Sequence, residues 1–164
     1  MDQSPASDPF FRLIRSRIKF RTYLLTRIPS AFFAGLRVPE ADRDRCVATV
    51  PCTWFTRNPF RSTYFACLSM AAEMSTGVLA MAHVYKSDPP VSMLVISLEA
   101  NFIKKATGLT RFVCSDGALI GEAIARAKAT GEGQTVKAHS TGTNADGDIV
   151  AEFFITWSFK VKSR

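Results

Sequence analysis

The sequence predicts an α+β fold in which an antiparallel sheet wraps one central helix. The patterns along the chain read helix, two strands, helix, two strands, helix, two strands, with no internal repeat and no linker. Residues 63–85 are apolar nearly all round, which is typical of a buried helix. The strand expected at 148–162 would be ~50 Å long if straight. A strand of that length must curl around something in so small a domain, and the buried helix is the obvious candidate.

Composition excludes several classes of protein. With 47% hydrophobic and 21% charged residues among 164, the chain is neither disordered nor a fibre. Four cysteines without a CxxC pair and only two histidines predict no metal site and no disulfide framework. We therefore expect reduced thiols and a cytoplasmic protein. Residues 1–8 are polar and carry two acids, which is unlike a secretory signal or a transit peptide.

The N-terminal segment predicts one basic amphipathic helix over residues 9–28. Asp8 and Pro9 form a start signal, and Pro29 stops the pattern. One stripe of this helix is apolar and is formed by Phe11, Ile14, Ile18 and Leu25. We divide the chain into a tail and helix at 1–31, packed on a single domain at 32–164.

Charge is concentrated in this helix, although the whole chain carries a net charge of +7. Six bases and no acid lie within residues 9–28. Three interpretations remain open: a solvated basic face, docking on a membrane surface, or contact with a polyanion. Nucleic acid is not an expected partner, because the sequence holds no recognised motif and few aromatic residues among the bases.

The remaining elements follow from alternation and turn signals. Pro51 places the second strand at a sheet edge or a bulge. The turn at 144–147 joins the last two strands, and every odd position from Ile149 to Val161 is apolar. The pattern predicts strands at 32–38, 46–56, 91–104, 109–115, 134–143 and 148–162, and a short helix at 118–129.

The long apolar helix is also the only stretch that could cross a bilayer by length. Glu73 lies at its centre, and Ser69, Ser75 and Gly77 weaken insertion further. A buried helix of a globular protein explains the segment better.

Residues 58–77, NPFRSTYFACLSMAAEMSTG, and the later NFIKKATG at 101–108 resemble the hotdog-fold thioesterases. The phenylacetate-pathway branch of that family carries an Asn, then His-Gly-Gly six residues on, then an acid nine residues after the His. Here Asn58 stands at the first position, Tyr64-Phe65-Ala66 at the second and Glu73 at the third. The C-terminal hairpin is similar to the closing strands of the family. The helices at 9–28 and 118–129 fit a less characterised branch of putative thioesterases.

The resemblance implies a hotdog fold, in which a curved antiparallel sheet wraps a long central helix. It also implies a homodimer, or a dimer of dimers (homotetramer), with acyl-thioester sites at the dimer interface. It implies no cofactor, since coenzyme A enters only as part of the substrate.

Glu73 is the only acid in the long helix. A buried carboxylate is costly unless it is paired, hydrogen-bonded or protonated, so stability gives no reason to place it there. The functional interpretation is a general base that activates water against a thioester carbonyl, with a pKa raised by partial burial. Direct attack through an anhydride is the alternative mechanism. A structural carboxylate, satisfied by the backbone or by an arginine, also remains open.

A tetrahedral intermediate needs hydrogen-bond donors aimed at its oxyanion. Free N–H groups at the start of the long helix, around Tyr64 and Phe65, supply them, and the resemblance indicates the backbone N–H of Phe65 in particular. Asn58 would orient the water or the carbonyl, or serve as a turn residue. Tyr64 would line the acyl pocket or simply pack.

Basic residues flank this region at two places. Lys104 and Lys105 end a strand, and Arg57 and Arg61 lie beside the helix start. They would contact the phosphates of coenzyme A, or face solvent. Histidines 83 and 139 have no partner motif, and we expect structural roles for both.

The leading hypothesis is therefore an acyl-CoA or acyl-carrier-protein thioesterase with Glu73 as general base. The alternative is a hotdog protein that binds acyl thioesters or lipids without catalysis and associates with membranes through its N-terminal helix. The acyl group itself is not indicated by the sequence.

Overall fold

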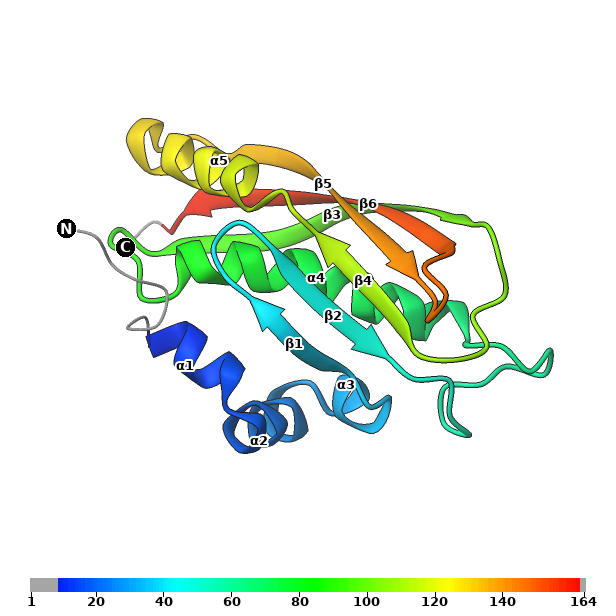
Figure 1. Ribbon diagram of the computed structural model, residues 1–164. Coiled ribbons are helices and arrows are strands. Elements are labelled where there is room, and N and C mark those ends of the chain that lie inside the picture. Colours follow the sequence, from blue (N-terminus) through cyan, green and yellow to red (C-terminus); the bar gives the residue numbers. More distant parts are fainter. Residues whose placement is uncertain (1–8, 163–164) are drawn as a thin grey trace.

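The computed structural model describes residues 9–162 and shows one antiparallel sheet curved over a long helix (Figure 1). The six strands lie in the order β1-β2-β4-β5-β6-β3. Consecutive neighbours pair antiparallel throughout. The strands are β1 Arg37–Ala41, β2 Cys46–Val50, β3 Val91–Phe102, β4 Thr110–Cys114, β5 Gln134–Thr143 and β6 Ile149–Val161.

Helix α4, Phe65–Val84, lies against the concave face of the sheet and forms the core with it. It is the one described helix long and apolar enough to cross a membrane, and two thirds of its apolar window is buried inside the protein. The sequence prediction of a central buried helix is confirmed.

The strand predicted at the C-terminus is confirmed, and its alternation holds from Ala151 to Phe159, whereas Ile149 is exposed and Val150 is buried. Odd-numbered residues of β6 from Phe153 to Phe159 are buried against α4, and even-numbered residues between them are half-buried. Trp157 donates a hydrogen bond from its indole Nε1 to Oγ1 of Thr76 at 2.9 Å. This bond satisfies the buried indole and fixes the sheet to the helix.

The prediction of a single N-terminal helix is wrong, because the helix is interrupted at Ser16. Two helices form instead, α1 at Pro9–Arg15 and α2 at Arg17–Arg27. Ser16 has extended backbone angles and caps α2, its hydroxyl accepting the N–H of Lys19 at 3.4 Å.

The break changes which residues face the core. Phe11 and Ile14 are buried as predicted, but Ile18 and Leu25 are exposed. Phe20 and Leu24 take the inward face of α2. The predicted apolar stripe assumed an unbroken helical period across residue 16, and the break shifts the phase of every later residue.

The strand predicted at 32–38 begins later than expected. Residues Pro29–Phe33 form a short helix, α3, for which Pro29 is a favourable first residue. Gly35 then turns the chain with φ of +74° before β1 begins. The strand predicted at 46–56 ends at Val50, just before Pro51, and an irregular loop leads to α4.

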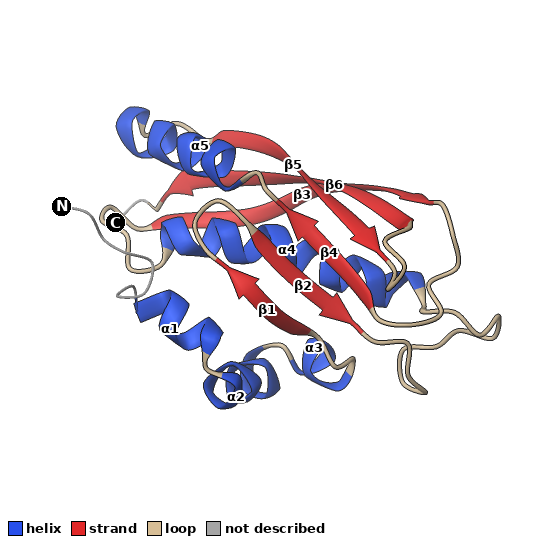
Figure 2. Cartoon of the chain, in the orientation of Figure 1, coloured by secondary structure: helices blue, strands red, loops and turns tan. Residues whose placement is uncertain are grey.

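Helix α5, Gly117–Thr130, packs on β5, β6 and the C-terminal part of α4 (Figure 2). Helices α1, α2 and α3 lie on the other side of the molecule, along the β1 edge of the sheet. Asp116 is the N-cap residue of α5, but its carboxylate accepts the backbone N–H of His139 at 2.7 Å rather than an N–H of the helix.

The packing of β5 on β4 gives a stability test. A Cβ at Gly142 would lie 2.5 Å from the ring of Phe112, which is fully buried and has no room to move. We expect Gly142→Ala to lower the free energy of unfolding by roughly 1–3 kcal/mol, measured by urea denaturation. Gly108→Ala is the matched control, because a Cβ there meets nothing within 4 Å. Equal stability of the two variants would contradict this packing.

Candidate functional site

Glu73 lies on the side of α4 that the sheet leaves uncovered and lines a cavity of about 140 Å³. Helices α1 and α2 form the opposite wall. No hydrogen bond or ion pair joins the Glu73 carboxylate to any residue within 9–162. Burial raises the pKa of this carboxyl group above its ordinary value. A carboxylate whose pKa is raised is a stronger base than an ordinary, solvated carboxylate.

The cavity is otherwise almost entirely apolar. Its walls include Phe10, Leu13, Leu24, Val78, Met81 and Met93. Among residues 9–162, Glu73 is the only charged residue that lines it. An apolar lining with one polar group is typical of a site that binds an apolar ligand in a fixed orientation.

Gly77 lies one helical turn after Glu73 and makes room for its side chain. A Cβ at Gly77 would lie 3.1 Å from Oε1 of Glu73 and 3.4 Å from the Trp157 ring. The carboxylate therefore lies over the small residue at i+4, held between α4 and the cavity.

The start of α4 forms a second hollow, a groove of about 540 Å³. Five of the residues predicted for the site lie in it: Asn58, Tyr64, Phe65, Lys104 and Lys105. The groove also holds exposed aromatic surface, with the rings of Phe65 and Phe102 6.4 Å apart.

Phe65 is the first residue of α4, and its backbone N–H has no acceptor among the residues that the structure places. The N–H of Tyr64 is occupied, because it donates to the carbonyl of Thr56 at 2.7 Å. Only one of the two donors considered from the sequence is thus free to bind an oxyanion.

Asn58 organises the loop before α4. Its Oδ1 accepts three hydrogen bonds: from the N–H of Phe60 at 3.0 Å, the N–H of Ser62 at 3.2 Å and the hydroxyl of Ser62 at 3.3 Å. This is the turn role weighed for it from the sequence. Its side-chain Nδ2 has no partner in the described part of the chain, and Asn58 is one of the residues that line the groove.

The four basic residues divide into two groups. Lys104 forms an ion pair with Asp148 at 3.0 Å, whereas Lys105 is exposed in the groove. Arg57 and Arg61 are exposed on the loop before α4 but do not line the groove.

One chain does not bring all predicted catalytic groups together. Phe65 and Glu73 are eight residues apart on one helix, so ~12 Å separates them along its axis. A single thioester carbonyl cannot contact both. The groove holds the predicted donor, and the cavity holds the predicted base.

The two histidines lie outside both hollows. His139 stacks on Phe154 at 4.6 Å between ring centroids, and its Nε2 lies 3.2 Å from Oε1 of Glu152. His83 lies under α5, where the absent side chain of Gly121 leaves space for its ring. Burial lowers the pKa of His83.

The chain belongs to the family described as a domain of unknown function, DUF4442, whose model matches residues 17–159. No curated protein sequence matches it. Solved structures match at low sequence identity and show the fold, which is the hotdog fold predicted from the sequence.

Three of these structures illustrate the likeness. A protein of unknown function from Pseudomonas aeruginosa, described as a probable thioesterase, is 19% identical with a TM-score of 0.75, over 88% of this chain and 96% of that one. A protein of unknown function from Chlorobaculum tepidum is 15% identical with a TM-score of 0.75, over 92% and 98%. A thioesterase from Haemophilus influenzae is 12% identical with a TM-score of 0.63, over 87% and 91%.

Sequence reasoning missed the residues of α1 and α2 that wall the cavity. Phe10, Phe20 and Tyr23 all line it, yet none belongs to the predicted stripe. Their aromatic character was the available signal, because a surface helix with a single buried face has no reason to carry three aromatic residues outside its apolar stripe.

The raised pKa of Glu73 predicts a pH-dependent effect on stability. A carboxyl group whose pKa is higher in the folded state stabilises the fold fully below about pH 4.5, and this contribution is lost as pH rises through the folded pKa. We therefore expect Glu73→Gln to be more stable than the wild type at pH 7 and to lose that advantage near pH 4. Urea denaturation across this range measures it, with the exposed Glu122→Gln as control. A Glu73→Gln variant less stable than wild type at pH 7 would show a partner for the carboxylate.

Proposed function

We propose that the protein hydrolyses an acyl thioester, with Glu73 as general base. The observation that carries this proposal is an unpaired carboxylate of raised pKa in the wall of an apolar cavity. The hotdog fold, shared with a thioesterase from Haemophilus influenzae, supports it.

In the proposed reaction, Glu73 takes a proton from water as the water oxygen attacks the thioester carbonyl. The Phe65 N–H donates to the oxyanion that forms. The carbon–sulfur bond then breaks, the carboxylic acid is released, and the thiolate leaves and takes up the proton. Apolar surroundings strengthen the contact of Glu73 with the water and the hydrogen bond from the Phe65 N–H to the oxyanion, because charges and dipoles attract more strongly where bulk solvent is excluded.

We infer that the complete site needs a second copy of the chain. The ~12 Å between Phe65 and Glu73 along α4 requires the donor of one copy to meet the base of the other. Strand β3 supports this, because it is an edge of the sheet and exposes Leu94, Ile96 and Leu98 by 65%, 52% and 43%. An apolar edge strand of this kind is suited to pairing with another strand.

The substrate's two ends would occupy the two hollows. The acyl group enters the cavity beside Glu73, and the thiol-bearing part lies along the groove at the start of α4. For coenzyme A, Lys105 is the best placed cation for a phosphate, because Lys104 is already paired with Asp148. Arg57 and Arg61 would reach a phosphate only beyond the groove itself.

Activity measurements with a panel of acyl-CoAs test the catalytic roles. We expect Glu73→Gln to lower kcat by roughly 10²–10⁴-fold through loss of the base. Phe65→Pro removes the donor N–H at residue 65. Proline is tolerated at this position, because residue 65 is the first residue of α4 and the preceding residue, Tyr64, has extended backbone angles. We expect Phe65→Pro to lower kcat by roughly 10²–10³-fold.

Two controls accompany these variants. Phe65→Ala removes the same ring but keeps the N–H, so it should retain kcat within about tenfold. Glu122→Gln removes an exposed carboxylate on α5 and should be fully active. Turnover that survives Glu73→Gln would remove Glu73 from the mechanism, and tight binding without turnover in the wild type would favour the non-catalytic alternative.

Mixing the two inactive variants tests the shared site. A mixed dimer of Glu73→Gln and Phe65→Pro chains has one site with both groups intact, so we expect it to recover up to half of the activity per dimer. Recovery would be absent if both groups acted within one chain.

The volume of the cavity predicts the length of the acyl chain. A cavity of about 140 Å³ holds an apolar group of about six carbon atoms, because one of roughly 150 Å³ binds benzene. We expect kcat/KM to peak near six to eight carbons among straight-chain acyl-CoAs. Leu13→Trp, which fills the cavity from the half-buried face of α1, should move the peak to shorter chains. Leu119→Trp on α5 is the control, and an unchanged peak in Leu13→Trp would place the acyl group elsewhere.

A further inference from the structure

The break at Ser16 leaves apolar side chains on the outer face of α2. Ile18 is 81% exposed and Leu25 is 46% exposed. They lie at positions i and i+7 with Thr22 between them, so all three share one helix face. Single exposed apolar residues are ordinary, but an aligned set on one helix is not.

This apolar surface continues onto α3 and the loop before α4. Arg21 lies over the ring of Phe32 at 3.8 Å, and a shallow groove runs between α2 and that ring. Phe33 follows at 59% exposed, with its ring 6.2 Å from that of Phe55, itself 52% exposed. We call this the α2–α3 surface, formed by Ile18, Leu25, Phe33 and Phe55.

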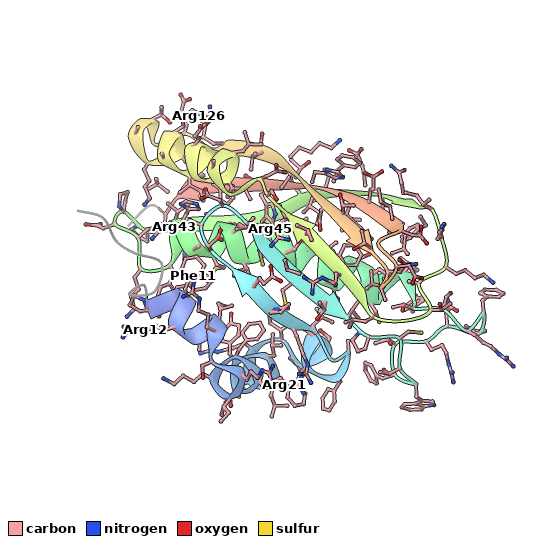
Figure 3. All side chains as sticks on the ribbon, viewed as in Figure 1. Phe11, Arg12, Arg21, Arg43, Arg45 and Arg126 are labelled. Atoms are coloured by element: carbon pink, nitrogen blue, oxygen red, sulfur yellow. The ribbon has the colours of Figure 1, made fainter. Side chains whose placement is uncertain are left out.

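The segment that carries most of the α2–α3 surface is strongly basic, and Arg17 and Arg21 line the groove together with Ile18 and Leu25. Residues 9–33 hold six bases and no acid: Arg12, Arg15, Arg17, Lys19, Arg21 and Arg27. None of the six forms an ion pair with a residue that the structure describes. Figure 3 shows Arg12 on α1 and Arg21 on α2 along one side of the molecule, and Arg126 on α5 along the opposite side.

We propose that the α2–α3 surface docks on an anionic phospholipid bilayer. Exposed apolar side chains flanked by bases are the features by which amphipathic helices bind lipid headgroups and the outermost acyl chains. A second copy of this chain is a poorer occupant, because a two-fold contact would place the same positive surface against itself. A nucleic acid would use the bases but leave the apolar side chains unexplained.

Vesicle sedimentation tests the proposal with the full chain. We expect binding to vesicles that contain phosphatidylglycerol, little binding to pure phosphatidylcholine, and release as salt concentration rises. The double variant Ile18→Ser with Leu25→Ser should lower the vesicle partition coefficient by roughly tenfold or more. Arg17→Gln with Lys19→Gln should lower it by a similar factor.

Leu119→Ser with Arg126→Gln on α5 is the matched control, since both side chains are exposed on the opposite side of the molecule. Its partition coefficient should equal that of the wild type. An unchanged thermal midpoint in every variant shows that the fold is intact, as expected for exposed positions.

Three outcomes would overturn the proposal. Equal sedimentation of the wild type with both kinds of vesicle excludes recognition of anionic lipid. Light scattering that shows an oligomer dissociated by Ile18→Ser with Leu25→Ser assigns the surface to a second copy. Binding to duplex DNA that needs the bases but not Ile18 and Leu25, without vesicle binding, assigns it to a polyanion. The result is independent of thioesterase activity.

Discussion

The need to cover helix α4 on all sides shapes the rest of the molecule. The sheet buries residues such as Ala72 and Leu79 on one side, and α5 packs on the C-terminal part. The remaining side faces α1 and α2, whose Phe11 and Leu24 are fully buried. The N-terminal helices are therefore part of the core rather than an appendage, because without them the apolar side of α4 that carries Val78 would face water.

The same cover accounts for the properties of Glu73. Residue 73 lies on the side of α4 that α1 and α2 enclose, and the walls around it offer apolar side chains instead of a cation. Desolvation without a partner is what raises the pKa of its carboxyl group. Gly77 keeps space open beside it, since a side chain there would press on the carboxylate and on Trp157. The cost in stability is concentrated at one residue, which is common where a protein keeps a group for chemistry.

Much of the fold could be predicted from the sequence because its strongest signals are local. The alternation of β6 and the apolar character of α4 each need only one segment to be recognised. The break at Ser16 could not be predicted from the local sequence, because a serine is tolerated within a helix, and the break shows only in the structure, where Phe11 and Leu24 are both buried. For the site, the resemblance to the hotdog thioesterases indicated Glu73 and Phe65 as individual candidate residues. It did not indicate that they lie in separate hollows, since that depends on which elements cover each end of α4.

One backbone feature gives the N-terminal helices two different faces. With an unbroken period through residue 16, Ile18 and Leu25 would continue the buried stripe, and Phe20 and Leu24 would turn toward solvent. The break reverses this assignment, so Phe20 and Leu24 wall the cavity beside Glu73 while Ile18 and Leu25 face outward among the bases. The cavity wall and the α2–α3 surface are thus opposite faces of the same helix. If binding to the outer face of α2 displaced this helix, the cavity wall formed by its inner face would move as well, because both faces belong to the same helix.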